Sequence, residues 1–138
     1  MTINESLKNW LYGFDNIEVD DRVNTDKLDG EAESYGLFKQ ATQEVTPFID
    51  GSRDVTAYFY FLARQSAKSE KARLSNIAWM EQLERWVFEK NRKRELPELD
   101  GPRSCNRVTI SVGAYMSESE NSETAQYQLS ISINYTEV

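Results

Sequence analysis

The C-terminal stretch from Tyr127 to Tyr135 alternates large apolar with polar side chains without a break. Because successive side chains of a β-strand point to opposite faces, we predict a strand that covers a core with one face and presents the other to water or to a partner. The residues predicted to be buried are Leu129, Ile131 and Ile133. The residues predicted to stay unburied are Gln128, Ser130 and Ser132.

The remaining pattern predicts one α+β domain over residues 1–138. Helices are expected from Thr2 to Gly13 and from about Glu70 to Arg94, where apolar residues recur at steps of three and four. Strands are expected within Phe14–Val23, Tyr35–Ala41, Val55–Arg64, Val108–Met116 and Thr124–Val138. The predicted fold is a mostly antiparallel sheet of four to five strands with two helices packed on one face, in the order α-β-β-β-α-β-β.

Two local features refine this prediction. The pair Asp50-Gly51 is a standard turn pair, so a turn is expected within Pro47–Ser52. The run from Tyr58 to Leu62 is apolar on both faces. It is therefore expected to be a central strand that is covered on each side, by helices or by a neighbouring subunit.

The charge of the chain limits its partners. Its 23 acidic residues against 16 basic ones give a net charge of −7, which argues against binding to a nucleic-acid backbone, since such binding needs a basic face. The basic run from Lys90 to Arg94 is better explained as positive charge at the C-terminal end of a helix. An acidic protein of this size can instead mimic DNA, and that alternative stays open.

Acidic residues are concentrated between residues 20 and 34, where apolar content falls. The acidic residues are Asp20, Asp21, Asp26, Asp29, Glu31 and Glu33. Their spacing lacks the alternating ligands and central glycine of a calcium-binding loop, so we predict a solvated acidic loop and no metal site.

The sequence gives no indication of catalysis or of a cofactor. It contains no histidine, which removes the commonest general base and the commonest metal ligand. Arg103 and Arg107 lie near the single cysteine, Cys105, and positive charge of this kind can lower the pKa of a thiol. Without a histidine base this is a weak signal, and a reduced cytosolic thiol without a catalytic role is the better interpretation. No run of about 18 apolar residues and no signal segment is seen, so we expect folding in a cytoplasm and no membrane span.

Several blocks of sequence together resemble a known family. These blocks are Phe48-Ile49-Asp50-Gly51, Tyr58–Leu62, Asn76-Ile77, Trp86-Val87, Asn91-Arg92-Lys93, Leu96-Pro97-Glu98-Leu99, Gly113-Ala114-Tyr115-Met116, Thr124–Leu129 and Ile133-Asn134-Tyr135. With them the chain resembles the small tail-terminator, or tail-completion, proteins of long-tailed bacteriophages and prophages of Gram-positive bacteria, which are often labelled minor capsid proteins. The similarity spans roughly residues 45–138.

The resemblance implies a structural virion protein that forms a ring with copies of itself, typically a hexamer. Such a ring caps the tail tube protein, ends tube polymerisation and presents a surface to the head-completion or connector protein. DNA passes through the ring without being bound specifically, which fits an acidic chain. The expected location is the virion tail, and the host cytoplasm during assembly.

Two sets of residues are candidates for these contacts. Aromatic side chains are favoured at the centres of protein interfaces, and the candidate subunit interface consists of Tyr58, Tyr60, Tyr127 and Tyr135. The acidic loop between residues 20 and 34 is expected to face the lumen or the rim of the ring. The alternative function is that of an acidic inhibitor or immunity-type protein that binds one host protein as a monomer or dimer, with DNA mimicry as one way of binding it. An enzyme is the least favoured interpretation.

Overall fold

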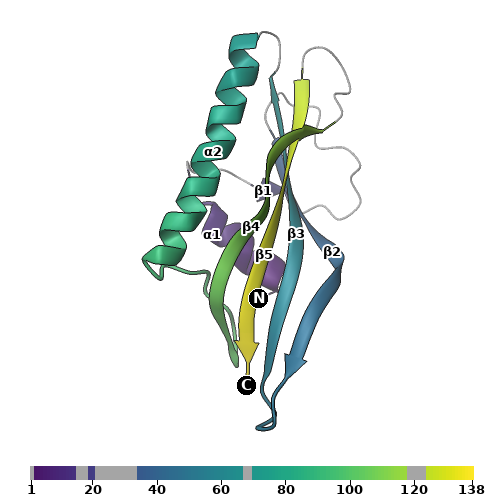
Figure 1. Cartoon of the computed structure of the whole chain (residues 1–138), viewed down its shortest axis with the longest axis vertical. Coiled ribbons are helices and arrows are strands. Elements are labelled where there is room, and N and C mark those ends of the chain that lie inside the picture. The colour runs from purple at the N-terminus through teal and green to yellow at the C-terminus, as the bar shows by residue number, and fades with distance from the viewer. Residues whose placement is uncertain (1, 15–18, 21–33, 67–69, 118–123) are drawn as a thin grey trace.

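The computed structural model describes residues 2–14, 19–20, 34–66, 70–117 and 124–138. It is an α+β fold in which two helices and a four-strand antiparallel sheet follow the order α-β-β-α-β-β (Figure 1). The helices are α1 (Ile3–Leu11) and α2 (Glu70–Arg92), and the long strands are β2 (Ser34–Pro47), β3 (Arg53–Ser66), β4 (Arg103–Ser117) and β5 (Thr124–Glu137). The two-residue β1 (Val19–Asp20) pairs in parallel with β2, so the spatial order is β1-β2-β3-β5-β4.

This arrangement differs from the predicted order at the first strand. The strand expected within Phe14–Val23 is reduced to β1, whereas β2 continues to Pro47, well beyond its predicted end at Ala41. The added part of β2 carries exposed side chains and is held by main-chain pairing with β3, as at Glu44↔Thr56. Main-chain pairing does not require apolar side chains at every second position, so the sequence pattern does not indicate that the strand continues.

The core lies between the helices and one face of the sheet. Leu129, Ile131 and Ile133 are fully buried, so the predicted register of β5 is confirmed. Gln128, Ser130 and Ser132 are only half-buried, as expected for the opposite face. The other main core residues are Leu7 and Leu11 of α1, Met80, Leu83 and Val87 of α2, and Phe59 and Phe61 of β3.

Helix α1 is capped at its first turn and is fixed to the rest of the core near its last turn. The Thr2 hydroxyl accepts a hydrogen bond from the Glu5 amide at 3.0 Å and so caps its first turn. Near its end, Trp10 packs on Trp86 of α2 with ring centroids 4.7 Å apart. The indole N–H of Trp10 also donates to the Glu95 carbonyl at 2.8 Å, so α1 is tied to the chain that follows α2.

The end of the sheet that carries the β2–β3 turn extends beyond the helices (Figure 1). A polar network crosses the strands there, centred on the buried Asn134. The Asn134 amide group donates to the Thr56 hydroxyl at 2.9 Å and to an Asp54 carboxylate oxygen at 3.2 Å, and its oxygen accepts from Asn106 Nδ2 at 2.8 Å. Cross-strand side-chain bonds of this kind make β3, β5 and β4 one stiff unit where no helix covers them.

Strand β4 is an edge strand, and its pairing with β5 is irregular. Its register shifts between Cys105 and Arg107, between Ile110 and Val112, and between Val112 and Tyr115. Each shift inserts extra residues into one strand, which bends that strand and increases its twist. Strand β2, at the other side of the sheet, shifts once, between Lys39 and Gln43.

The buried register of β5 makes a stability prediction. Ile131→Asp is expected to abolish cooperative folding, because an unpaired charge in a dry core costs several kcal/mol, comparable to the ~5–15 kcal/mol that stabilises a typical domain. The matched control is Ser132→Asp, one residue along on the half-buried opposite face, which should melt cooperatively. Thermal unfolding followed by circular dichroism compares the two; a cooperative transition in Ile131→Asp would contradict the register.

Candidate functional site

The four tyrosines of the candidate interface lie on two different faces of the sheet. Tyr58 is half-buried and Tyr60 is 39% exposed, and both lie on the face away from the helices. Burial, followed by a hydrogen bond with Glu44, raises the pKa of the Tyr58 hydroxyl above its ordinary value. The structure therefore leaves Tyr58 and Tyr60 as candidate surface residues.

Tyr127 and Tyr135 are buried on the helix-covered face, so the prediction that they provide exposed aromatic surface is wrong. They occupy odd positions of β5, as do Leu129, Ile131 and Ile133, and side chains two residues apart in a strand share a face. The Tyr127 hydroxyl is 3.4 Å from Asn76 Nδ2, which supplies a polar partner inside the core.

The acidic loop is mostly outside the described residues. Of its members, only Asp20 falls within a described element, β1; Asp21, Asp26, Asp29, Glu31 and Glu33 do not, so the prediction that the loop faces a lumen or rim stays a prediction. Within the described ranges, no three residues of the His, Cys, Asp or Glu types are grouped so that they could hold a metal ion. No helix among these residues is long and apolar enough to cross a membrane.

Cys105 is a half-buried residue of β4, and its environment differs from the predicted one. Burial raises the pKa of its thiol to about 11, and neither the hydrogen bond with the Arg107 carbonyl nor the charge of Arg94 offsets this. The nearby arginines therefore do not activate this thiol, because desolvation disfavours the thiolate more than neighbouring groups favour it.

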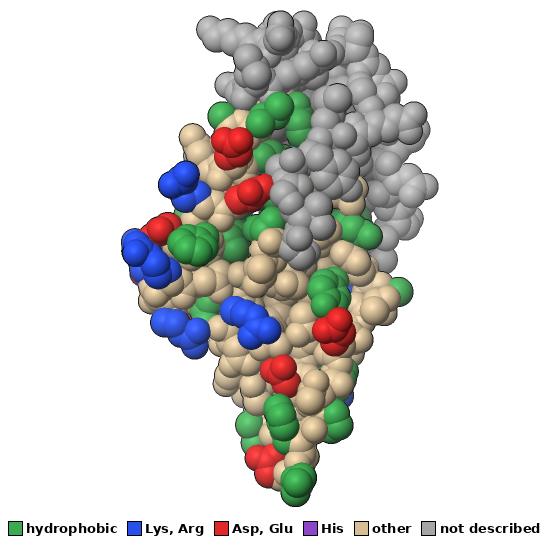
Figure 2. Space-filling view, in the orientation of Figure 1, with side chains coloured by type: hydrophobic (Ala, Val, Ile, Leu, Met, Phe, Trp, Pro, Cys, Tyr) green, Lys and Arg blue, Asp and Glu red, His purple; other side chains and the backbone are tan. Residues whose placement is uncertain are grey.

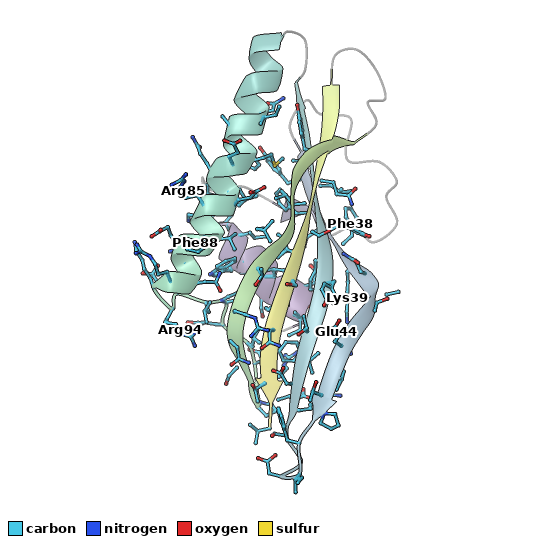
Figure 3. The ribbon with its side chains drawn as sticks, in the orientation of Figure 1. Phe38, Lys39, Glu44, Arg85, Phe88 and Arg94 are labelled. Atoms are coloured by element: carbon cyan, nitrogen blue, oxygen red, sulfur yellow. The ribbon has the colours of Figure 1, made fainter. Side chains whose placement is uncertain are left out.

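A groove lies between the C-terminal half of α2 and the edge strand β4, with a volume of about 390 Å³. Its apolar lining comes from Val87 and Phe88 of α2 and from Val108 and Ile110 of β4, and Asn91 and Arg107 add polar groups. Phe88 is 66% exposed. Figure 3 shows Phe88 on α2 with Arg85 and Arg94 on either side of it, and Glu84 adds one acidic group to the groove lining.

Asn91 sets the width of this groove by joining α2 to the edge of the sheet. Its Nδ2 donates to the Val108 carbonyl at 2.6 Å, and its Oδ1 accepts from the Val108 amide at 2.8 Å. The same Nδ2 donates to the Val87 carbonyl at 2.7 Å. Because the side-chain amide satisfies both main-chain groups of Val108, it takes the place of a neighbouring strand at this point of the edge.

A second apolar surface is the hairpin tip, which we define as residues 45–52 at the β2–β3 turn. Phe48 is 50% exposed, Val45 is exposed, and Ile49 is fully exposed. Figure 2 shows hydrophobic and acidic side chains together at this narrow end of the molecule. Large apolar residues at the end of a hairpin, which none of the described strands and helices covers, indicate a contact surface.

The hairpin tip is a fixed turn, as the Asp50-Gly51 pair predicts. Phe48 N–H donates to the Ser52 carbonyl at 2.8 Å, and Gly51 has a φ of 92°. Asp50 Oδ1 accepts from the Ser52 amide at 3.0 Å and from the Ser52 hydroxyl at 2.6 Å, and these bonds hold the pKa of Asp50 below its ordinary value. The sequence signal that could have identified this surface is Phe48-Ile49, two large apolar residues directly before a turn pair.

The Asn91 contacts predict a clear loss of stability on truncation. Asn91→Ala should lower the free energy of unfolding by roughly 2–3 kcal/mol, because the amide and carbonyl of Val108 lose their partners, while the better helix propensity of alanine returns only a few tenths. Gln82→Ala, at an exposed position of α2, is the control and should change little. Urea unfolding measures both; equal stabilities would show that Asn91 does not hold the helix to the strand.

The raised pKa of Cys105 predicts slow alkylation. The folded pKa of about 11 exceeds the unfolded value of about 8.5, so the stability contributed by the neutral thiol is fully present below pH 8.5 and is lost as pH rises towards 11. At pH 8.5, iodoacetamide should therefore label the urea-unfolded chain much faster than the folded chain. Equal labelling rates, measured by mass spectrometry, would contradict the buried thiol.

No protein-family profile matches this chain, and no curated protein matches its sequence. Any function proposed for the chain therefore rests on the resemblance of its sequence blocks and on where the fold places exposed apolar and charged side chains.

Proposed function

We propose that this chain is a phage tail terminator: a structural virion protein that caps the tail tube as an oligomeric ring, ends tube polymerisation and forms the tail side of the head–tail junction. The observation that carries the proposal is exposed apolar surface at two separate places. One is the hairpin tip, with Phe48 and Ile49, and the other is the groove beside Phe88. A ring needs two different surfaces on each subunit, one for each neighbour.

The open face of the sheet supports the same proposal. Tyr58 and Tyr60 of the central strand β3 lie on the face that the helices leave uncovered. A tyrosine side chain has an apolar body and a polar hydroxyl, so it suits a contact that forms only on assembly, with the tail tube or with a neighbouring subunit. Several modest contacts in a closed ring act together, so no single contact needs a large buried area.

The charge of the chain is consistent with this role and with its rival. A net charge of −7 would let DNA pass through a ring without binding to it. The same charge would suit an acidic inhibitor that mimics DNA. However, a DNA mimic binds through acidic side chains, whereas the hairpin tip presents the exposed apolar side chains of Phe48 and Ile49. The exposed apolar surface therefore favours the terminator.

Deletion of the gene from its phage or prophage tests the proposal. Heads should form normally, while tails should reach uncontrolled lengths and fail to join heads, because nothing ends tube polymerisation. Electron microscopy of the lysate measures tail length and attachment, and supplying the wild-type gene in trans should restore both. Tails of normal length joined to filled heads would overturn the terminator proposal and leave the inhibitor ahead.

A further inference from the structure

We propose that the hairpin tip of one copy of this chain docks into the groove between α2 and β4 of the next copy, so that subunits associate head to tail. The inference deepens the proposed function, on which it rests, because it assigns the two surfaces of the subunit contact. The occupant of the groove is thus a second copy of this chain.

The two surfaces match in apolar character. The hairpin tip presents Phe48 and Ile49 outward, and the groove is walled by Val87, Phe88 and Ile110. The volume of about 390 Å³ falls in the range of pockets that enclose small ligands, ~300–1,000 Å³, so it has room for large side chains. Docking would cover the apolar residues that each surface leaves in water.

The two surfaces also match in charge. The hairpin from Glu44 to Thr56 carries three acidic residues, Glu44, Asp50 and Asp54, against one basic residue, Arg53, which pairs with Glu137 at 2.6 Å. The groove lining holds one basic residue, Arg107, and one acidic residue, Glu84. The end of α2 beside it adds Lys93 and Arg94, so basic side chains outnumber the acidic one around the groove. Figure 2 shows Lys and Arg side chains gathered on the side of the molecule occupied by α2, away from the tip.

Charge also argues against two copies meeting tip to tip. Such a contact would bring Asp50 of each copy to the other, and like charges across an interface oppose association. A tip that enters the groove instead places its acidic groups near arginine side chains. Figure 1 shows the β2–β3 turn at one end of the sheet, beyond the end of α2, so one subunit can use both surfaces at once.

Both surfaces are fixed before they meet. The hydrogen bonds of Asp50 with Ser52 hold the turn, and the Asn134 network stiffens the strands behind it. Asn91 holds the two walls of the groove together. Preorganised surfaces lose little conformational entropy on binding, so a contact of modest area becomes effective when a ring closes.

Cysteine cross-linking tests the contact without removing its apolar residues. The background is Cys105→Ala. Thr46→Cys places a thiol at the hairpin tip and Thr109→Cys places one in the groove lining; both threonines are exposed. After oxidation of the concentrated protein, the double variant should give a ladder of dimers, trimers and larger species. A mixture of the two single variants should give dimers only, and each single variant alone should give none.

Two further variants make the result specific. Thr46→Cys combined with Ala78→Cys is the matched control, since Ala78 is exposed on α2 ten residues before Phe88, about 15 Å away along the helix, and should give no ladder. Adding Ile49→Asp to the double variant should lower the cross-linked yield by about tenfold or more while the protein still melts cooperatively.

Other outcomes overturn the inference. Dimers of Thr46→Cys alone would show a tip-to-tip contact, and an unlinked double variant would show that the tip of one copy does not dock in the groove of another. The deletion experiment judges the proposed function separately. If the deletion gives overlong tails and the double variant gives no ladder, the terminator stands and the assigned contact fails. If the double variant gives a ladder and the deletion gives normal tails, the assigned contact stands and the terminator proposal fails.

Discussion

The hydrogen bonds between Asn91 and Val108 are the constraint that fixes the position of α2 against the sheet, and with it the groove on the surface of this fold. One side-chain amide satisfies the main-chain N–H and C=O of an edge strand and also bonds to the Val87 carbonyl of its own helix. Helix α2 is thereby held beside the rim of the sheet as well as over its face. That position opens the groove under Phe88, because a helix centred on the sheet would fill the space with its own side chains.

The sequence pattern was sufficient where burial follows a simple period. The alternation around Ile131 located β5 and its register, and the steps between Met80, Leu83 and Val87 located α2. It failed where main-chain pairing or distant contacts decide the structure. The continuation of β2 to Pro47 depends on its neighbour β3, and Asn91 meets a residue 17 positions away. No local period records either.

The candidate site shows the same division. Tyr127 and Tyr135 were assigned to the surface because aromatic residues suit interfaces, yet their position in the alternation already assigned them to the core. In that conflict the period of the strand outweighs the average preference of the side chain. The exposed Phe48 and Ile49 are the reverse case, since their apolar character alone predicts burial. They lie in water because the sheet extends beyond the helices at the end that carries them.

The register shifts of β4 have a consequence for a protein whose sheet ends in a long edge strand. A long, regular edge strand offers a row of main-chain groups to any other strand, and copies can then add without limit as an extended sheet. The shifts near Asn106, Ser111 and Gly113 interrupt that row, and Asn91 occupies part of it. Uncontrolled stacking of this kind is the route to fibres. An interrupted edge hinders this addition of strands, so any contact between copies would depend on side-chain surfaces, which can be filled only once.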